Sequence, residues 1–196
     1  LMETLRPSAF KQGWAWVGSE ISESASISEE NLAIRILTDL SVFTASIRWQ
    51  EKGQRPAGFT SEAQLNERAL DYSALLSIYN NTPGLVSDKL KGVLDVAWSA
   101  ISSQKRVRGI VFAYDEAQNL ADHAARNQYP LSILLDVFQS LQRRGVRFML
   151  LLVGLPTLFP KLVQARTYAE RMFHVITIGS LSEEATKAAI LKPVES

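Results

Sequence analysis

Residues 109–118 read GIVFAYDEAQ, a run of six uncharged and mostly apolar residues that ends in two adjacent carboxylates. Two later segments, FMLLLV at 148–153 and VITI at 175–178, have the same apolar character, and helical patterns separate the three. Continuous apolar strands that alternate with helices are typical of a parallel sheet covered on both faces. The sequence therefore predicts an α/β fold in which helices flank a parallel sheet.

The remaining elements are predicted from hydrophobic spacing and from helix-start signals. Ser26 and Glu29 form a capping-box pattern before one helix, and Ser87 or Asp88 can cap another. Trp14 and Trp16 fall on one face of a short strand and are expected in the core. Helices are expected over 1–10, 32–40, 65–78, 90–101, 131–141, 161–172 and 182–191, with a loop at 50–60 and a strand at 14–17.

Composition sets limits on the class of protein. The 196 residues suit one domain, 46% of them are hydrophobic, and the net charge of +1 provides no broad field for nucleic acid. The absence of cysteine excludes disulfides, zinc–cysteine sites and thiol nucleophiles within the sequence. The longest apolar run, Phe148 to Leu155, is far shorter than the roughly 20 residues of a membrane-spanning helix. We expect a cytoplasmic protein with no membrane partner.

The carboxylates Asp115 and Glu116 lie where the 109–114 strand ends, and ligands of such sheets bind beyond the carboxyl ends of the strands. In one interpretation Asp115 only caps a turn and Glu116 is only solvated. In the other, the pair is a Walker B motif. Asp115 would then hold Mg²⁺, in most cases through water, and Glu116 would polarise the water that attacks the γ-phosphate of ATP.

Three further polar residues are candidates for the same chemistry. Thr157 follows the 148–153 strand, where it could cap a helix or sense the γ-phosphate. Arg166 and Arg171 could be solvated helix residues, or one of them could be an arginine finger that reaches the nucleotide of a neighbouring subunit. Arg171 is the better finger candidate because it directly precedes the expected 175–178 strand.

From Gly109 to Glu195 the sequence resembles the AAA+ ATPases, specifically the bacterial and archaeal branch related to replication-initiator and transposition-accessory ATPases. The resemblance rests on Asp-Glu-Ala-Gln at 115–118, Gly-x-Pro-x-Leu at 154–158, Arg-x-Phe at 171–173 and Leu-Ser-Glu-Glu-Ala at 181–185. It implies a P-loop NTPase core that uses ATP and Mg²⁺, forms a homo-oligomer and acts on a DNA or protein partner. It also implies that residues 182–196 begin the link to a C-terminal helical lid.

The main departure from the family is the missing phosphate-binding loop. No Gly-x-x-x-x-Gly-Lys-Ser/Thr occurs in the 196 residues. In the family this loop lies between the first strand and the first helix, so residues 1–196 are expected to be a core without the strand and loop that carry it. We expect that strand upstream of Leu1 and in the middle of the complete sheet, and we expect the 196 residues alone to be inactive.

Two basic clusters and two histidines have simpler interpretations. The clusters, Lys105, Arg106 and Arg108 and then Arg143, Arg144 and Arg147, precede strands and are expected at the amino edge of the sheet. They are either solvated helix ends or a small contact site for DNA or another partner. His123 and His174 have no companions at metal-ligand spacing and are expected to be structural.

Three hypotheses for function follow from the sequence. The first is an ATP-hydrolysing AAA+ module that couples nucleotide state to the remodelling or assembly of a partner. The second is a nucleotide-dependent signalling switch in which turnover is incidental. The third is a non-catalytic adaptor that has kept the fold with a degenerate site.

Overall fold

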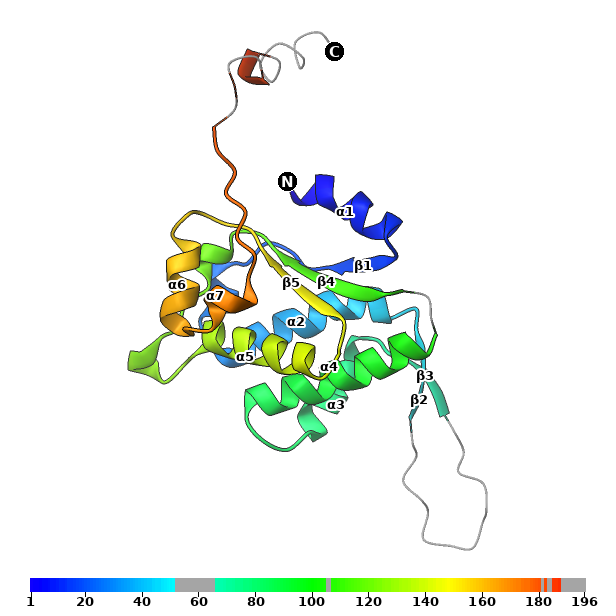
Figure 1. Cartoon of the computed structure of the whole chain (residues 1–196). Coiled ribbons are helices and arrows are strands. Elements are labelled where there is room, and N and C mark those ends of the chain that lie inside the picture. The colour runs from blue at the N-terminus through cyan, green and yellow to red at the C-terminus, as the bar shows by residue number, and fades with distance from the viewer. Residues whose placement is uncertain (52–65, 105–106, 181, 183–184, 188–196) are drawn as a thin grey trace, which may run out of the picture.

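The computed structural model describes residues 1–51, 66–104, 107–180, 182 and 185–187 (Figure 1). The first half of the chain contains α1 (Met2–Lys11), β1 (Trp14–Val17), the 3-10 turn η1 (Glu23–Ser26), α2 (Glu29–Thr44), β2 (Arg48–Glu51), β3 (Asn66–Ala69), α3 (Tyr72–Asn81) and α4 (Val86–Ser103). The second half contains β4 (Gly109–Tyr114), the 3-10 turns η2 (Ala117–Asn119) and η3 (Ala124–Arg126), α5 (Pro130–Arg143), β5 (Phe148–Leu152), α6 (Leu158–Ala165) and α7 (Ala169–Met172).

The main sheet has three parallel strands in the order β1-β4-β5. Its register pairs Trp14 with Gly109 and Ile110 with Phe148. All six residues of the central strand β4 are buried, as its continuous apolar sequence predicts. The predicted α/β class and the parallel sheet flanked by helices are thus confirmed.

The hydrophobic core lies between one face of this sheet and the helices α2, α4 and α5 (Figure 1). Phe112 of β4 is its centre, because its ring meets Phe138 and Phe148 edge-on at centroid distances of 5.1 and 5.2 Å. Aromatic rings prefer this geometry because the positive edge of one ring meets the negative face of the other. The predicted apolar faces of the helices at 32–40, 90–101 and 131–141 all point into this core.

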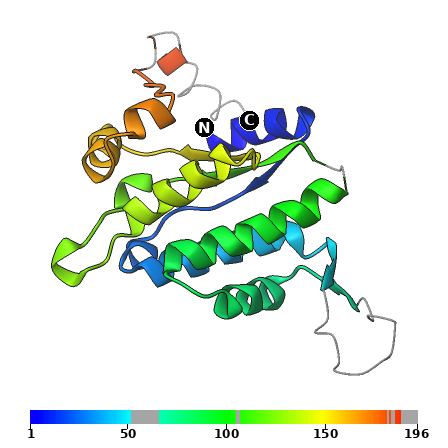
Figure 2. The same cartoon turned by 60° about the horizontal axis from the view of Figure 1, so that its bottom comes forward.

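The opposite face of the sheet has less cover. Of the described elements, α1 alone overlies it, across the sheet from α4, and α1 has no buried residue (Figures 1 and 2). Trp14 and Trp16 lie half-buried on this face, and Met149 of β5 is 46% exposed. The prediction that both faces are covered holds only in part, and the placement of the two tryptophans in the core is wrong.

Residues 66–69 form a strand where the sequence predicts a helix. β3 pairs antiparallel with β2, with Arg48 opposite Ala69, and the Leu70 N–H donates to the Ile47 carbonyl at 3.0 Å. The helical pattern holds only from Tyr72, where Asp71 caps α3 by accepting the Ala74 N–H. Most of the expected 50–60 loop, residues 52–60, lies outside the described residues, and residues 50 and 51 belong to β2.

The predicted strand at 175–178 is not formed. Residues 173–180 have no regular structure, and Val175, Ile176 and Ile178 are 50%, 77% and 67% exposed. An isolated strand cannot satisfy its backbone hydrogen bonds, and in the described part of the chain this segment pairs with no neighbour. The apolar pattern alone therefore did not determine strand formation.

The observed helix ends differ in part from the predicted ones. Ser28 caps α2 by accepting the Asn31 N–H at 3.1 Å, whereas the Ser26 hydroxyl accepts the Ala121 N–H instead. Asp88 does cap α4, through the Leu85 N–H at 3.2 Å. The expected 161–172 helix divides into α6 and α7 because Arg166 adopts an extended conformation.

The last expected helix is described only at its start. Ser182 Oγ accepts the Ala185 N–H at 3.2 Å, as a cap would, and residues 185–187 are helical. Residues 188–196, most of the expected link to a helical lid, lie outside the described residues. Within the described ranges, no helix has the length and apolar character to cross a bilayer.

Candidate functional site

The candidate site lies at the carboxyl edge of the three-stranded sheet, where Asp115 follows β4. The backbone of Asp115 is fixed by the chain that follows β1. Its N–H donates to the Ser19 carbonyl at 3.1 Å, and its carbonyl accepts the Ile21 N–H at 2.9 Å. The parallel pairing thus continues beyond the strands as a bridge between Glu20 and Asp115, which fixes the backbone position from which the Asp115 carboxylate extends.

Glu116 adopts a left-handed backbone conformation, with φ 51° and ψ 32°. This region is unfavourable for a side chain that carries a Cβ, and such residues are enriched at functional sites. Two hydrogen bonds stabilise the turn: the Glu116 N–H donates to Asp115 Oδ1 at 2.9 Å, and the Ala117 N–H donates to the Val153 carbonyl at 2.9 Å.

Gln118 connects Glu116 to the loop after β5. Its side-chain Nε2 donates to Glu116 Oε2, and its Oε1 accepts the Leu155 N–H at 3.1 Å. The Lys161 ammonium of α6 donates to the Gln118 carbonyl at 2.7 Å. The Gln118 side chain is thus restrained by Leu155 and its backbone by Lys161, so the Glu116 carboxylate that it binds has little freedom to rotate.

Asp115 and Glu116 line a cavity of about 770 Å³ together with residues of α1, α2 and the whole of β1, and at its other end the cavity reaches Gly13 and Val107. The polar residues around it are Glu3, Arg6, Ser19, Glu20, Asp39, Asp115 and Glu116. Among the described residues, the lining therefore carries five carboxylates against the single guanidinium of Arg6, a charge balance that favours a cation.

A buried polar cluster adjoins this cavity, and the sequence analysis missed it. Asp39 of α2 is only 4% exposed, and it accepts hydrogen bonds from Arg35 Nε at 3.0 Å and Ser19 Oγ at 3.3 Å. The hydrogen bond to Asp39 raises the pKa of Arg35, so the guanidinium stays charged. The sequence does carry a signal for this pair. Asp39 falls on the apolar face of its helix, four residues after Arg35, and a carboxylate in that position needs a charged partner.

Tyr114 is fully buried beside this cluster. Burial raises the pKa of Tyr114 well above its ordinary value, and the neighbouring Asp39 carboxylate adds to the effect. Its hydroxyl has no hydrogen-bond partner among the described residues.

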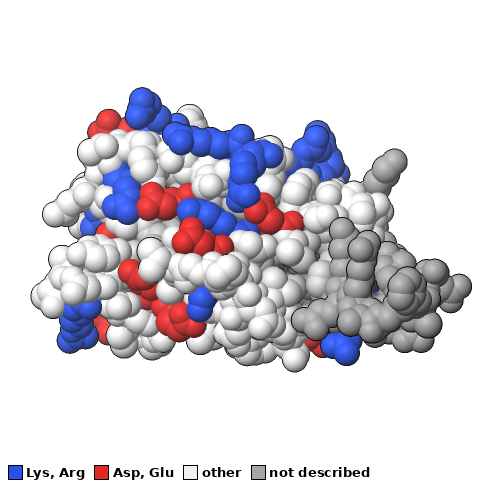
Figure 3. All heavy atoms as spheres, turned by 90° about the horizontal axis from the view of Figure 1, so that it is seen from below, with Lys and Arg blue, Asp and Glu red and all other residues white. Residues whose placement is uncertain are grey.

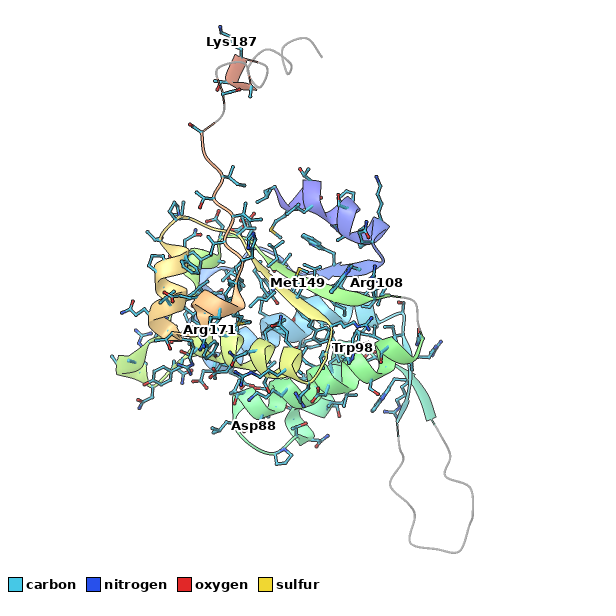
Figure 4. The ribbon with its side chains drawn as sticks, in the orientation of Figure 1. Asp88, Trp98, Arg108, Met149, Arg171 and Lys187 are labelled. Carbon is cyan, nitrogen blue, oxygen red and sulfur yellow. The ribbon has the colours of Figure 1, made fainter. Side chains whose placement is uncertain are left out.

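The other three predicted site residues do not line the cavity. Thr157 precedes α6 as an exposed residue, and its side chain makes no capping hydrogen bond. Arg171 is exposed on α7, away from the strand β1 that lines the cavity (Figure 4). The structure thus brings Asp115 and Glu116 together at one cavity and leaves Thr157, Arg166 and Arg171 outside its lining.

Arg166 has a partner of its own. Its guanidinium donates to both carboxylate oxygens of Asp136 in α5, at 3.0 and 2.8 Å, and the Tyr168 hydroxyl donates to the same carboxylate. Partial burial disfavours the charged form of Asp136, but the bonds from Arg166 and Tyr168 outweigh it and hold the pKa of Asp136 below its ordinary value. This pairing fixes α7 against α5, and a finger role for Arg166 would require breaking it.

The donor set at the carboxyl edge fits Mg²⁺ better than a metal that needs a full protein cage. Among the described residues, no group of three or more His, Cys, Asp or Glu side chains has the geometry to hold a metal ion. Mg²⁺ keeps several waters and commonly uses one or two carboxylates together with substrate phosphates. Asp115 and Glu116, at the border of an open cavity, meet that requirement.

Comparison with protein-family models, curated proteins and solved structures found no match. The geometry of the site and the sequence motifs therefore carry the functional argument.

Proposed function

We propose that the cavity at the carboxyl edge of the sheet binds Mg²⁺–ATP and that the protein is a nucleoside triphosphate hydrolase module of AAA+ type. One observation carries the proposal: the Asp115–Glu116 pair lines a cavity together with Arg6 of α1. A divalent cation suits the carboxylates, and the Arg6 guanidinium suits a phosphate group. ATP in complex with Mg²⁺ presents both charges together.

The two carboxylates have different roles in this proposal. Asp115, whose backbone is fixed by Ser19 and Ile21 after β1, would hold the cation through a water ligand. Glu116 accepts a hydrogen bond from the attacking water and orients it toward the γ-phosphate. When bound, Mg²⁺ would neutralise charge on the phosphate oxygens. Gln118 restrains the Glu116 carboxylate through its side-chain amide.

The open edge of β5 supports the AAA+ assignment. β5 is the last strand of the three, and the extended segment after α7 carries the exposed side chains Val175, Ile176 and Ile178. A further strand beside β5 could pair with both β5 and this segment and bury those side chains. The proposal places a strand with a phosphate-binding loop there, because no such loop occurs in the 196 residues.

Arg171 is the candidate finger, because it is exposed, whereas Arg166 is paired with Asp136. Thr157 is the candidate γ-phosphate sensor and would have to approach the nucleotide through a change in the loop before α6. The finger role requires a homo-oligomer in which Arg171 faces the cavity of a neighbouring subunit. The proposed role of the assembly is to remodel or assemble a DNA or protein partner, within the cytoplasm.

The test compares Glu116→Gln with Asp115→Asn and with the control Glu23→Gln, an exposed acidic residue of η1 that does not line the cavity. Each variant is made in the full encoded polypeptide and in the 196-residue chain, and ATP binding and phosphate release are measured separately. Glu116→Gln should keep Mg²⁺–ATP binding and lose phosphate release by about 100-fold or more. Asp115→Asn should weaken the Mg²⁺ dependence of binding, and Glu23→Gln should match the wild type.

The same measurements separate the three hypotheses. Unchanged phosphate release in Glu116→Gln would refute the hydrolase proposal. Tight Mg²⁺–ATP binding with negligible turnover, in a protein whose oligomeric state changes with nucleotide, would favour the signalling switch. Failure of the full encoded polypeptide to bind Mg²⁺–ATP would favour the non-catalytic adaptor.

A further inference from the structure

A second hollow lies at the opposite, amino edge of the same three strands. It has a volume of about 430 Å³ and is lined by Trp14, Arg108, Gln142, Arg147, Phe148 and Met149. Trp14 begins β1, Arg108 directly precedes β4, and Arg147 directly precedes β5. Because the strands are parallel, these residues meet at one edge, at the other end of the strands from Asp115 and Glu116.

The two arginines of this hollow are available for a ligand. Both are exposed, and neither guanidinium makes a hydrogen bond or ion pair with another residue in the part of the chain that the structure describes. Basic side chains gather along one side of the face seen in Figure 3, where several lie directly beside acidic ones. Arg144, for example, is paired with Asp95 at 2.5 Å. Among the described residues, the guanidinium groups of Arg108 and Arg147 lack such a partner, and no carboxylate lines the hollow.

Trp14 provides an aromatic surface in the same hollow as these arginines. The sheet register places Gly109 between Trp14 on one side and Arg147 on the other, so the Trp14 and Arg147 side chains leave the same face. A Cβ at Gly109 would lie 2.4 Å from Trp14 Cζ3, which means that the indole lies directly over the glycine backbone. Any other residue at 109 would displace the ring. The exposed side chain of Met149 extends the apolar surface on this face (Figure 4).

We propose that this hollow binds a nucleotide unit, with its base against Trp14 and its phosphate between Arg108 and Arg147. The combination of a stacking surface with guanidinium groups suits a molecule that joins a planar ring to a phosphate. The volume is within the range of small-ligand sites and accommodates one such unit. The unit is either a free mononucleotide or one residue of a single-stranded nucleic acid, because both present the same chemistry. Trp14 also borders the Asp115–Glu116 cavity, but Arg108 and Arg147 line only this hollow, so the proposed site does not depend on the function proposed for that cavity.

The test measures fluorescence anisotropy of a labelled ten-residue oligothymidylate in EDTA, which removes Mg²⁺-dependent binding at the other edge. Arg108→Gln and Arg147→Gln should each weaken affinity at least fivefold and reduce the slope of log affinity against log salt by about 0.7. Arg126→Gln is the matched control, because Arg126 is exposed in η3 and does not line the hollow; it should change affinity less than twofold. Trp14→Leu should weaken binding and Trp14→Phe should largely preserve it.

Thymidine monophosphate is the second probe. If thymidine monophosphate displaces the oligonucleotide from the wild type but not from Arg147→Gln, a free nucleotide is sufficient to occupy the site. If only the oligonucleotide binds, the ligand is a single strand. Each result supports the proposal. Arg147→Gln carries the test if Trp14→Leu fails to fold, because the Arg147 side chain is exposed.

Four results would overturn the proposal. The first is that neither probe binds, and the second is that Arg126→Gln loses as much affinity as Arg108→Gln and Arg147→Gln. The third is that duplex DNA of the same length binds more tightly than the oligothymidylate. The fourth is that a phosphotyrosine peptide of the same charge binds as tightly as the oligothymidylate. The last result would identify a phosphoprotein partner in place of a nucleotide.

Discussion

The side-chain amide of Gln118 donates a hydrogen bond to the Glu116 carboxylate and accepts one from the Leu155 N–H. It therefore links the proposed water-orienting group after β4 to the loop after β5. Because Glu116 already has a strained left-handed backbone, the direction of its carboxylate depends on this side-chain restraint. Gln118 is thus a positioning residue for the proposed reaction.

Replacing Gln118 by Ala should lower kcat for ATP hydrolysis by roughly tenfold to a hundredfold, with little change in KM. The substitution frees the Glu116 carboxylate and leaves the cavity lining intact. Gln12→Ala, at an exposed residue after α1, is the control. Steady-state kinetics on the full encoded polypeptide measure kcat and KM for each variant. A tenfold to hundredfold rise in KM without a fall in kcat would contradict the positioning role.

Gly154→Ala should have the same effect through steric displacement. A Cβ at Gly154 would lie 2.5 Å from Gln118 Oε1, so the amide would have to leave its place against Leu155. The double variant Gly154→Ala/Gln118→Ala should lose no more kcat than Gln118→Ala alone, because both changes remove one interaction. Gly179→Ala, where an added Cβ would meet nothing within 4 Å, is the control. Fully additive losses would indicate that Gly154 acts elsewhere.

The sequence predicts the position of Asp115 and Glu116 because parallel strands bring their carboxyl ends to one edge. It does not predict Gln118 as a restraint, since that role requires the loop after β5 to approach the turn after β4. It also does not predict the hairpin of β2 and β3, where pairing with a distant strand outweighs a helical pattern. Local periodicity determines single elements, whereas these features depend on contacts between segments far apart in the chain.

The ion pair between Arg166 and Asp136 should stabilise the fold in a pH-dependent way. Because the pKa of Asp136 is lowered in the folded protein, its contribution is present above the ordinary value of 3.8 and is lost as the pH falls through the lower folded pKa. Asp136→Asn should therefore reduce the free energy of unfolding by about 1 kcal/mol at pH 7, a modest value because the pair is about a third exposed.

Urea unfolding of Asp136→Asn and the wild type at pH 7 and at pH 3 tests this expectation. The difference between the two proteins should shrink at the lower pH. Asp95→Asn, which removes the partner of Arg144, is a control for a surface pair. A difference that stays constant across this pH range would indicate that the Asp136 carboxylate contributes by packing and not by charge.

Tyr114→Phe should leave the protein as stable as the wild type or more stable, by up to about 1 kcal/mol. Its hydroxyl is buried without a hydrogen-bond partner among the described residues, and an unpaired buried hydroxyl costs desolvation energy that the substitution removes. Tyr79→Phe is the matched control, because Tyr79 is equally buried but donates to Glu30 Oε2 at 2.8 Å. It should lose about 1 kcal/mol. Urea unfolding at pH 7 measures the free energy of unfolding of both variants. If Tyr114→Phe loses as much stability as Tyr79→Phe, the Tyr114 hydroxyl is hydrogen-bonded after all, with Asp39 or a buried water as its partner.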